Sequence, residues 1–255
     1  GAVSKFSEED LIPNEEVIIM KTLGGYIKRM NPKAYRVQHR GGKGIIGLST
    51  RGEDVVTHFF SASTHDRLLF FTSLGRVFET HAYEIPEGSR TARGQALVNF
   101  LGISGGETVT SILVAGGKTE KEAGQEFLLM VTKNGLVKKT AAEAFDNVRR
   151  SGIKAMGLQK DDELRWASLA SKDEEVMLLS KLGQSIRFKE ADLRMMGRGA
   201  RGVRGILLKK DDELSAMRVV RGPELLVISE NGYGKKTDVK EHKLQHRGGR
   251  GIKTR

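Results

Sequence analysis

Five arginines occupy equivalent places in this chain, each fifteen residues after a glycine that follows a short apolar run. The arginines are Arg40, Arg90, Arg150, Arg198 and Arg247, and the glycines are Gly25, Gly75, Gly135, Gly183 and Gly232. Nineteen residues after these glycines, four units carry a second glycine and the third carries Lys154. A guanidinium binds phosphate oxygens through several N–H donors, and glycine allows a backbone to approach a ligand closely. The spacing therefore predicts a repeated anion-binding loop.

The excess positive charge of the chain lies in these loops. Its 255 residues include 43 Lys and Arg against 32 Asp and Glu, a net charge of +11. The windows 36–46, 86–96, 146–156, 194–204 and 243–253 hold 16 basic and two acidic residues, whereas the other 200 residues hold 27 basic and 30 acidic ones. Equivalent loops in a radial array would form a basic belt, which favours a polyanionic partner such as nucleic acid.

The loops are positioned by a repeat that has the pattern of β-strands. Each unit begins with an apolar run and a turn containing LG or NG, which predicts a β-hairpin. Two further strands are expected in each unit, a glycine-spaced one at 45–48, 96–99, 155–158 and 203–207 and one introduced by an acidic residue at 54–59, 107–113, 163–169 and 213–219. The sequence thus predicts an all-β, propeller-like array of four-stranded antiparallel blades, with five repeats visible and the last incomplete.

Residues of other chemistries are scarce or badly placed. The chain has no cysteine, no apolar run near the length of a membrane helix and no phosphate-binding GxxxxGK[ST] element. His58, His65 and His81 lack carboxylates at ligand spacing, so we expect structural roles for them, and we expect Trp166 to lie in the core. Residues 140–147 are expected to form a turn. No catalytic, metal-binding or cofactor-binding residue is predicted, and a soluble intracellular protein is expected.

The kind of polyanion follows from what surrounds the basic residues. Aromatic residues make up 6% of the chain, and only Tyr35 stands beside a basic loop. Proteins that bind single strands rely on aromatic stacking, so duplex DNA is favoured as the partner. Two alternatives stay open: a propeller scaffold for protein interactions, which would show an exposed apolar or aromatic rim, and an arginine-glycine RNA binder, in which the glycines would not stand at fixed offsets.

The first basic loop carries a resemblance to a known family. The stretch QHRGGKG at 38–44 resembles the glycine-rich basic heptad of the C-terminal domain of the DNA gyrase A subunit. The segments EEDLIPNEEV, THDRLLFFTSLGRVF, SRTARGQ, MGRGARGVRGI and NGYGKKT also resemble successive blades of that domain, so the resemblance runs from Glu8 to Arg255. It implies a β-pinwheel, a propeller variant that exchanges strands between blades and wraps duplex DNA on its rim. Topoisomerase IV has a related domain with a degenerate heptad, and a topoisomerase IV-like protein remains the alternative.

The resemblance also implies an organisation for the chain. Residues 1–14 are expected to be a linker or closing segment, and 15–255 a single DNA-wrapping β-pinwheel with blades at about 15–66, 67–125, 126–172, 173–221 and a partial one at 222–255. The fragment itself would not be an enzyme, since none of its four tyrosines follows an arginine as the DNA-cleaving tyrosine of the family does. Its partners would be duplex DNA, the rest of the gyrase A subunit and the gyrase B subunit. Together the subunits would form a cytoplasmic heterotetramer that introduces negative supercoils into DNA. ATP and Mg²⁺ would be bound outside this domain. The isolated domain would be monomeric, without a cofactor or a membrane.

The heptad has a near copy in the fifth unit, at 245–251. The family usually has a basic second residue there, and His39 and His246 depart from that pattern. The family domain commonly has six blades, and because the chain stops after the fifth basic loop the outer strands of the fifth blade are expected to be missing. The residues expected to contact DNA are Gln38, His39, Arg40, Gly41, Gly42, Lys43, Gly44, Arg90, Arg93, Arg149, Arg150, Lys154, Arg198, Arg201, Arg204, Gln245, His246, Arg247, Gly248, Gly249, Arg250 and Gly251.

Overall fold

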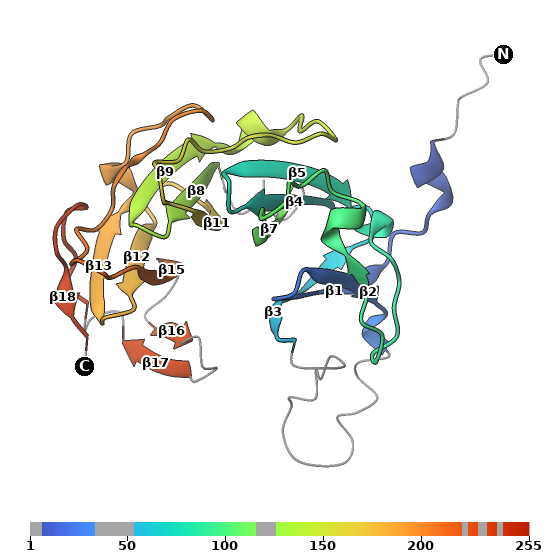
Figure 1. Ribbon diagram of the computed structural model, residues 1–255, viewed down its shortest axis with the longest axis horizontal. Helices are drawn as coiled ribbons and strands as arrows, with labels where there is room; N and C mark the ends of the chain where they lie inside the picture. Colours follow the sequence, from blue (N-terminus) through green and yellow to red (C-terminus); the bar gives the residue numbers. More distant parts are fainter. Residues whose placement is uncertain are drawn as a thin grey trace, which may run out of the picture.

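The chain folds into a series of small antiparallel sheets. The computed structural model describes residues 7–33, 54–115, 126–220, 224–228, 234–238 and 242–254. Their strands form four four-stranded sheets and one two-stranded sheet, which we call blades 1 to 5 in chain order. The blades follow one another along an arc (Figure 1). The predicted all-β, propeller-like class with four-stranded antiparallel blades is confirmed.

The strands of each blade run in order from the inner to the outer side of the arc. Blade 1 contains β3 (Val56–Ser63), β1 (Glu16–Thr22), β2 (Tyr26–Met30) and β6 (Gln95–Ala96). Blade 2 contains β7 (Val109–Ala115), β4 (Arg67–Thr72), β5 (Arg76–His81) and β10 (Ile153–Lys154). Blade 3 contains β11 (Leu164–Ala170), β8 (Phe127–Thr132), β9 (Leu136–Ala141) and β14 (Val203–Arg204).

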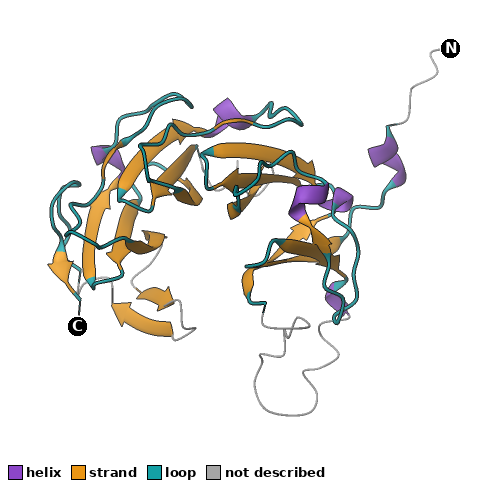
Figure 2. Ribbon diagram, in the orientation of Figure 1, coloured by secondary structure: helices purple, strands orange, loops and turns teal. Residues whose placement is uncertain are grey.

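Two further blades and several helical turns complete the fold. Blade 4 contains β15 (Leu214–Val220), β12 (Glu175–Ser180), β13 (Gln184–Lys189) and β18 (Ile252–Lys253). Blade 5 contains β16 (Glu224–Ile228) and β17 (Gly234–Asp238). One-turn 3-10 helices stand at η1 (Glu8–Leu11), η2 (Ala82–Glu84), η3 (Leu97–Asn99), η4 (Ala142–Phe145) and η5 (Glu190–Asp192). Figure 2 shows these turns beside the strands.

The apolar first strand of each hairpin becomes the second strand of its sheet. In β4 the side chains from Leu68 to Phe71 are at most 2% exposed, so both faces of this strand are buried. The faces pack against neighbouring blades, and Ile19 of blade 1 shares one core with Phe70 and Phe78 of blade 2. Similar cores join blade 2 to blade 3 and blade 3 to blade 4. This packing explains why the runs are apolar throughout instead of alternating.

The hairpin turns depend on glycine and on a preceding hydroxyl residue. Gly75 has φ +76° and donates its N–H to the carbonyl oxygen of Thr72 at 2.9 Å. The Thr72 hydroxyl in turn accepts the N–H of Arg76. Equivalent turns stand at Gly25, Gly135 and Gly183, with φ of 84°, 89° and 86°. Positive φ disfavours residues with a Cβ, which accounts for the repeated glycine.

The third strand of the second to fifth units joins the preceding blade. β6 follows the hairpin of blade 2 in the chain, yet it pairs with β2 of blade 1. β10, β14 and β18 pair in the same way with β5, β9 and β13. The strand exchange that the family resemblance implies is therefore present, and each of the first four blades takes its outermost strand from the next repeat.

These exchanged strands are shorter than the predicted glycine-spaced strands. The predicted strand at 96–99 is a two-residue strand followed by η3, the strand at 203–207 ends at Arg204, and the strand predicted at 155–158 lies at Ile153–Lys154. The reason is local: the carbonyl oxygen of Gly75 accepts the N–H groups of both Ala155 and Met156, so the chain turns away at the end of the neighbouring hairpin. The strand predicted at 45–48 lies outside the described residues.

Candidate nucleic-acid interface

Four of the five basic loops lie along the convex edge of the arc. We call them the second, third, fourth and fifth rim loops, at residues 86–96, 146–154, 194–204 and 243–253. Each ends in the exchanged strand that forms the outermost position of the preceding blade. Figure 2 shows loops of this kind running along the outside of the strands. The first basic loop, including Gln38 to Gly44, lies outside the described residues.

Each rim loop follows the outer strand of the preceding blade closely. The second, fourth and fifth loops first run parallel to that strand, through the bridges Arg29–Glu87, Lys139–Met195 and Arg187–Leu244. They then turn back and pair with it antiparallel. The loop therefore covers the hydrogen-bonding edge of the second hairpin strand (β2, β9 or β13) and places its own turn outward.

A glycine with positive φ marks the return of each loop. Gly94 and Gly202 have φ of 89° and 82°, and a Cβ on either would stand 2.5 Å from a carbonyl oxygen of the outer strand. Gly251 has φ 68° and a still closer approach to the carbonyl oxygen of Ser185. These glycines are required by the contact of the loop with its own fold. The contact of Gly251 with DNA, expected from the sequence, stays a prediction.

The third loop departs from the spacing of the others. Its positive-φ glycine is Gly152, and the exchanged strand begins at the next residue, so this loop is two residues shorter than the second, fourth and fifth. Lys154 therefore follows the glycine instead of replacing it. Arg150 lies two residues before that glycine, whereas Arg90, Arg198 and Arg247 lie four residues before theirs. The predicted equivalence of the arginines is thus wrong for the third unit, in which Val148 occupies the equivalent place.

Most predicted side chains of the described loops are solvent-exposed. The exposed residues are Arg93, Arg149, Arg150, Lys154, Arg198, Arg201, Arg204, His246, Gly249 and Arg250, and the partly buried ones are Arg90, Gln245, Arg247, Gly248 and Gly251. Arg93 stacks on the ring of Tyr26, with its guanidinium carbon 3.8 Å from the ring centroid. A stacked guanidinium keeps its outer N–H groups available to an anion.

The fifth loop is joined to the fourth through its arginine and glycines. Arg247 donates to the carbonyl oxygens of Asp192 and Arg204, at 3.2 and 3.1 Å. The N–H of Gly248 bonds to the carbonyl oxygen of Gly205, and the carbonyl oxygen of Gly249 accepts the N–H of Leu207. The imidazole of His246 lies 3.3 Å from the carboxylate of Asp192. These contacts fix the spacing of neighbouring loops along the edge.

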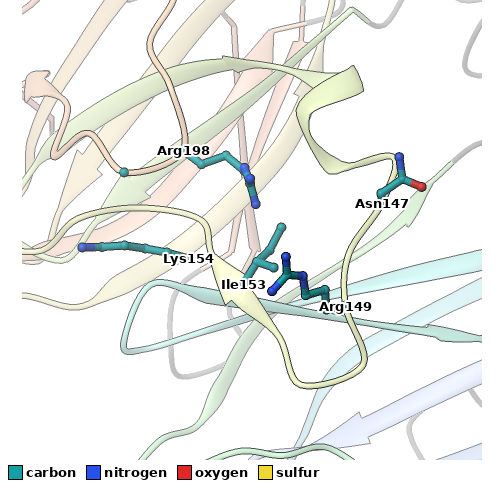
Figure 3. A pocket seen from close by; sticks show the side chains of 6 residues that line it. Asn147, Arg149, Ile153, Lys154 and Arg198 are labelled. Carbon is teal, nitrogen blue, oxygen red and sulfur yellow. The ribbon is translucent and has the colours of Figure 1, made fainter.

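The third and fourth loops flank an open basic hollow of about 760 Å³. It is lined by Asn147, Arg149, Ile153, Lys154, Arg198 and Gly199, so no carboxylate lines it. Figure 3 shows Arg198 and Arg149 extending toward Ile153 from opposite sides, while Lys154 points away from them. Two guanidinium groups that face each other without a carboxylate between them attract an anion such as a phosphate group.

Arg150 has different surroundings from Arg149. It lines a second hollow of about 230 Å³ together with Glu79, His81 and Glu84 of blade 2. The carboxylates offset the positive charge at this place, so the two adjacent arginines of the third loop present different fields to a ligand. Of the pair, Arg149 is the better placed to receive an anion.

Two buried lysines support the rim loops. Lys28 of β2 and Lys138 of β9 are at most 1% exposed. The Lys28 Nζ donates to the carbonyl oxygens of Ser89, Arg90 and Ala92 at 2.9, 2.8 and 2.9 Å. Burial lowers the pKa of Lys138 to about 8, with Lys154 and Arg198 adding to the effect, and burial also lowers the pKa of Lys28. Neither lysine was predicted, although lysine three residues after the turn glycine recurs at Lys28, Lys138 and Lys235.

His65 and His81 lie near acidic side chains, and Trp166 lies in β11. His65 approaches Glu9, and His81 approaches Glu84, each at 3.9 Å. Within the described ranges no group of three or more histidine, aspartate or glutamate side chains could hold a metal ion. Trp166 is partly buried and packs against the core shared by blades 3 and 4. In the same part of the chain, no helix is long and apolar enough to span a membrane.

Comparison with known proteins places this architecture in a family. The family model described as the DNA gyrase C-terminal domain, beta-propeller, matches residues 16–63, 66–115, 126–171, 174–221 and 223–255. The DNA gyrase A subunit of Mycobacterium bovis is 45% identical over 251 residues, which are 97% of this chain and 30% of that protein.

Solved structures agree with this assignment. A DNA gyrase A C-terminal domain has a TM-score of 0.74 and 28% identity, covering 93% of this chain and 76% of that one. The C-terminal domain of DNA topoisomerase IV has a TM-score of 0.73 and 24% identity, covering 95% of this chain and 73% of that one, which shows a shared fold. The five matched repeats, the exchanged strands and the gyrase relatives agree: this chain belongs to the family of DNA gyrase C-terminal domains.

Proposed function

We propose that the rim loops bind the phosphate backbone of duplex DNA and that the duplex bends along the convex edge of the arc. The observation that carries this proposal is the placement of the four described basic loops at equivalent outer positions of successive blades. Contacts of this kind go to phosphates and use the deformability of DNA, and they need no reading of base edges. The sequence between the loops carries a small net negative charge, which leaves the loops as the attractive surface.

The energy of bending is within reach of such contacts. Bending about 20 to 30 base pairs by about 40 to 90° costs on the order of 1 to 6 kcal/mol. If about six to ten phosphate contacts form, affinity falls about a thousandfold or more between about 50 and 200 mM salt. The exposed and partly buried cations along the described loops are numerous enough to supply that number of contacts.

Within the whole protein, the domain would serve a larger reaction. The chain spans 30% of the length of the curated relative from Mycobacterium bovis. We propose that it is a non-catalytic part of the gyrase A subunit, that it acts with the rest of that subunit and with the gyrase B subunit, and that the bent DNA gives strand passage its direction toward negative supercoils. ATP and Mg²⁺ would be used outside this domain.

The experiment compares two sets of substitutions that each remove three positive charges. R198A/R201A/R204A removes cations of the fourth loop, and K160A/K209A/K210A removes exposed lysines outside the loops. We expect the first variant to bind a linear duplex at least about tenfold more weakly, with a salt slope reduced by about 2 to 3, because each lost phosphate contact lowers the slope by about 1. Equal losses in the two variants would contradict binding at the rim.

A further inference from the structure

The ammonium groups of Lys28 and Lys138 bind the backbone of a loop that comes from the next repeat. Lys138 donates to the carbonyl oxygens of Gly197 and Arg198, at 3.1 and 2.6 Å, and to that of Ala155 at 2.5 Å. Gly197 and Arg198 lie five and four residues before Gly202, the same offsets as Ser89 and Arg90 before Gly94. Lys28 and Lys138 therefore hold the same part of two different rim loops.

Neither ammonium has an acidic partner in the described part of the chain, where no salt bridge includes Lys28 or Lys138. The charges that act on them are positive, from Arg90 on Lys28 and from Lys154 and Arg198 on Lys138. Burying an unpaired charge is costly unless hydrogen bonds replace its hydration. Three backbone carbonyl oxygens supply that replacement, so each lysine and its loop stabilise each other.

The fold does not require a lysine at the third position after the turn glycine, where Lys28 and Lys138 stand. The equivalent residue is Phe78 in blade 2 and Ile186 in blade 4, by their pairing with Phe70 and Leu178. The third rim loop places Gly152 against the ring of Phe78, and Gly249 of the fifth loop lies beside Ile186. An apolar side chain therefore supports the shorter third loop and also the fifth loop, which has the spacing of the second and fourth. Contact between a buried lysine and loop carbonyl groups is a property of the second and fourth loops.

The direction of the bound carbonyl groups has a consequence for the outer surface. In a trans peptide the C=O and the following N–H point in opposite directions, and the described residues contain no cis peptide bond. With the carbonyl oxygens of Gly197 and Arg198 turned toward Lys138, the N–H groups of Arg198 and Gly199 are turned away from it. Successive outward N–H groups make an anion-binding concavity, and Arg198 and Gly199 line the basic hollow.

We propose that Lys28 and Lys138 are positioning residues, each of which holds the backbone of the rim loop from the next repeat so that the amides and arginines of that loop face DNA phosphates. The inference rests on the proposed function for its DNA readout. Its structural part, that one lysine orders one loop, can be tested without DNA. The burial of both side chains excludes direct contact between these lysines and a phosphate in this structure.

The experiment uses K28M and K138M, each as the control for the other. By hydrogen exchange, we expect K138M to speed exchange in residues 194–204 at least about tenfold and to leave 86–96 unchanged, because the loop loses its two hydrogen bonds to a charged group. K28M should give the reverse pattern. K138F, which copies the residue of blade 2, is the second variant if K138M does not fold. Unchanged exchange in both loops, or an equal change in both, would overturn the inference.

Titration with a linear duplex over a range of salt gives the second readout. K154M removes one exposed charge and should lower the salt slope by about 1. K138M should lower it by about 2 or more, because several cations of the fourth loop lose their alignment together. Faster exchange without weaker DNA binding would refute the positioning role. If the unsubstituted chain does not bind duplex DNA, the proposed function fails, whereas the exchange result still decides whether the lysines order the loops.

Discussion

At the scale of single residues, the rim depends on side chains that DNA would not touch. Gly94, Gly202 and Gly251 allow the loops to return against the outer strands, and Lys28 and Lys138 hold the loop carbonyl groups from below. Arginines supply the outward charge, but their position depends on these inner contacts. Substitutions at the inner residues should therefore change stability or loop order, and the salt dependence of DNA binding through them, whereas substitutions at the outer arginines should change the salt dependence alone.

Gly202 and Gly199 provide a matched test within the fourth loop. G202A would place a Cβ 2.5 Å from the carbonyl oxygen of Val137 at a φ of +82°, whereas a Cβ on Gly199 meets nothing within 4 Å. We expect G202A to lower the free energy of unfolding by about 1–3 kcal/mol. G199A should change it by less than about 0.5 kcal/mol. Urea unfolding measures both, and equal stabilities would show that the close approach is relieved at little cost.

At the scale of elements, local patterns predict the hairpins well. The turn glycines and apolar runs indicate the strand pairs β1–β2, β4–β5, β8–β9 and β12–β13, because both the turn and the burial of the first strand leave marks in the sequence. By contrast, nothing in the sequence of a two-residue exchanged strand indicates which strand it pairs with. Fixed offsets also concealed the shorter third loop, since Arg150 happens to fall at the expected distance while Gly152 holds the structural place.

His58 links pH to the stability of blade 1. Burial lowers the pKa of His58 to about 4, and the positive charge of Lys21 contributes to this shift. Lys21 of β1 lies opposite His58 of β3 in the sheet. The unfolded chain, with a histidine pKa near the ordinary value of 6.5, binds the proton first, so stability is lost as pH falls from about 6.5 toward 4. H58Q should reduce this loss by on the order of 2 kcal/mol.

The measurement is the free energy of unfolding across that pH range. H246Q is the control, because the side chain of His246 is 97% exposed. The comparison uses the slope of the free energy of unfolding against pH. A loss of packing energy in H58Q that is the same at every pH therefore does not affect the result. A parallel pH dependence in the unsubstituted chain and H58Q would mean that His58 is not held neutral by the fold.

At the scale of the whole molecule, shared cores give the arc its shape. Blades 1 and 2, 2 and 3, and 3 and 4 each bury one common set of side chains, so neighbouring rim loops keep a fixed separation. The belt of charge was predictable from the repeat, because the basic windows recur at nearly constant spacing. The path of the belt along the molecule was not predictable from the repeat. The exchange of strands places each loop on the preceding blade, away from the hairpin of its own repeat.

The heptad at 38–44 is expected to determine how the whole domain wraps DNA. Its replacement by alanines should leave most DNA binding, because the four described loops remain, but it should abolish the shift in linking number in a relaxation assay with topoisomerase I. R250A/K253A, which removes two exposed charges of the fifth loop, should weaken binding and keep part of the shift. An unchanged shift after replacement of 38–44 would exclude the heptad as the determinant of the wrap.

The exchanged strands tie the completion of each blade to synthesis of the next repeat. While the protein is being translated, β2, β5, β9 and β13 each leave the ribosome before the segment that will occupy their open edge. Until then an incomplete sheet presents unpaired backbone groups to other nascent chains. The molecule thus matures from its N-terminus in steps that trail elongation by roughly one repeat, and a ribosome paused between repeats would leave an edge ready to aggregate.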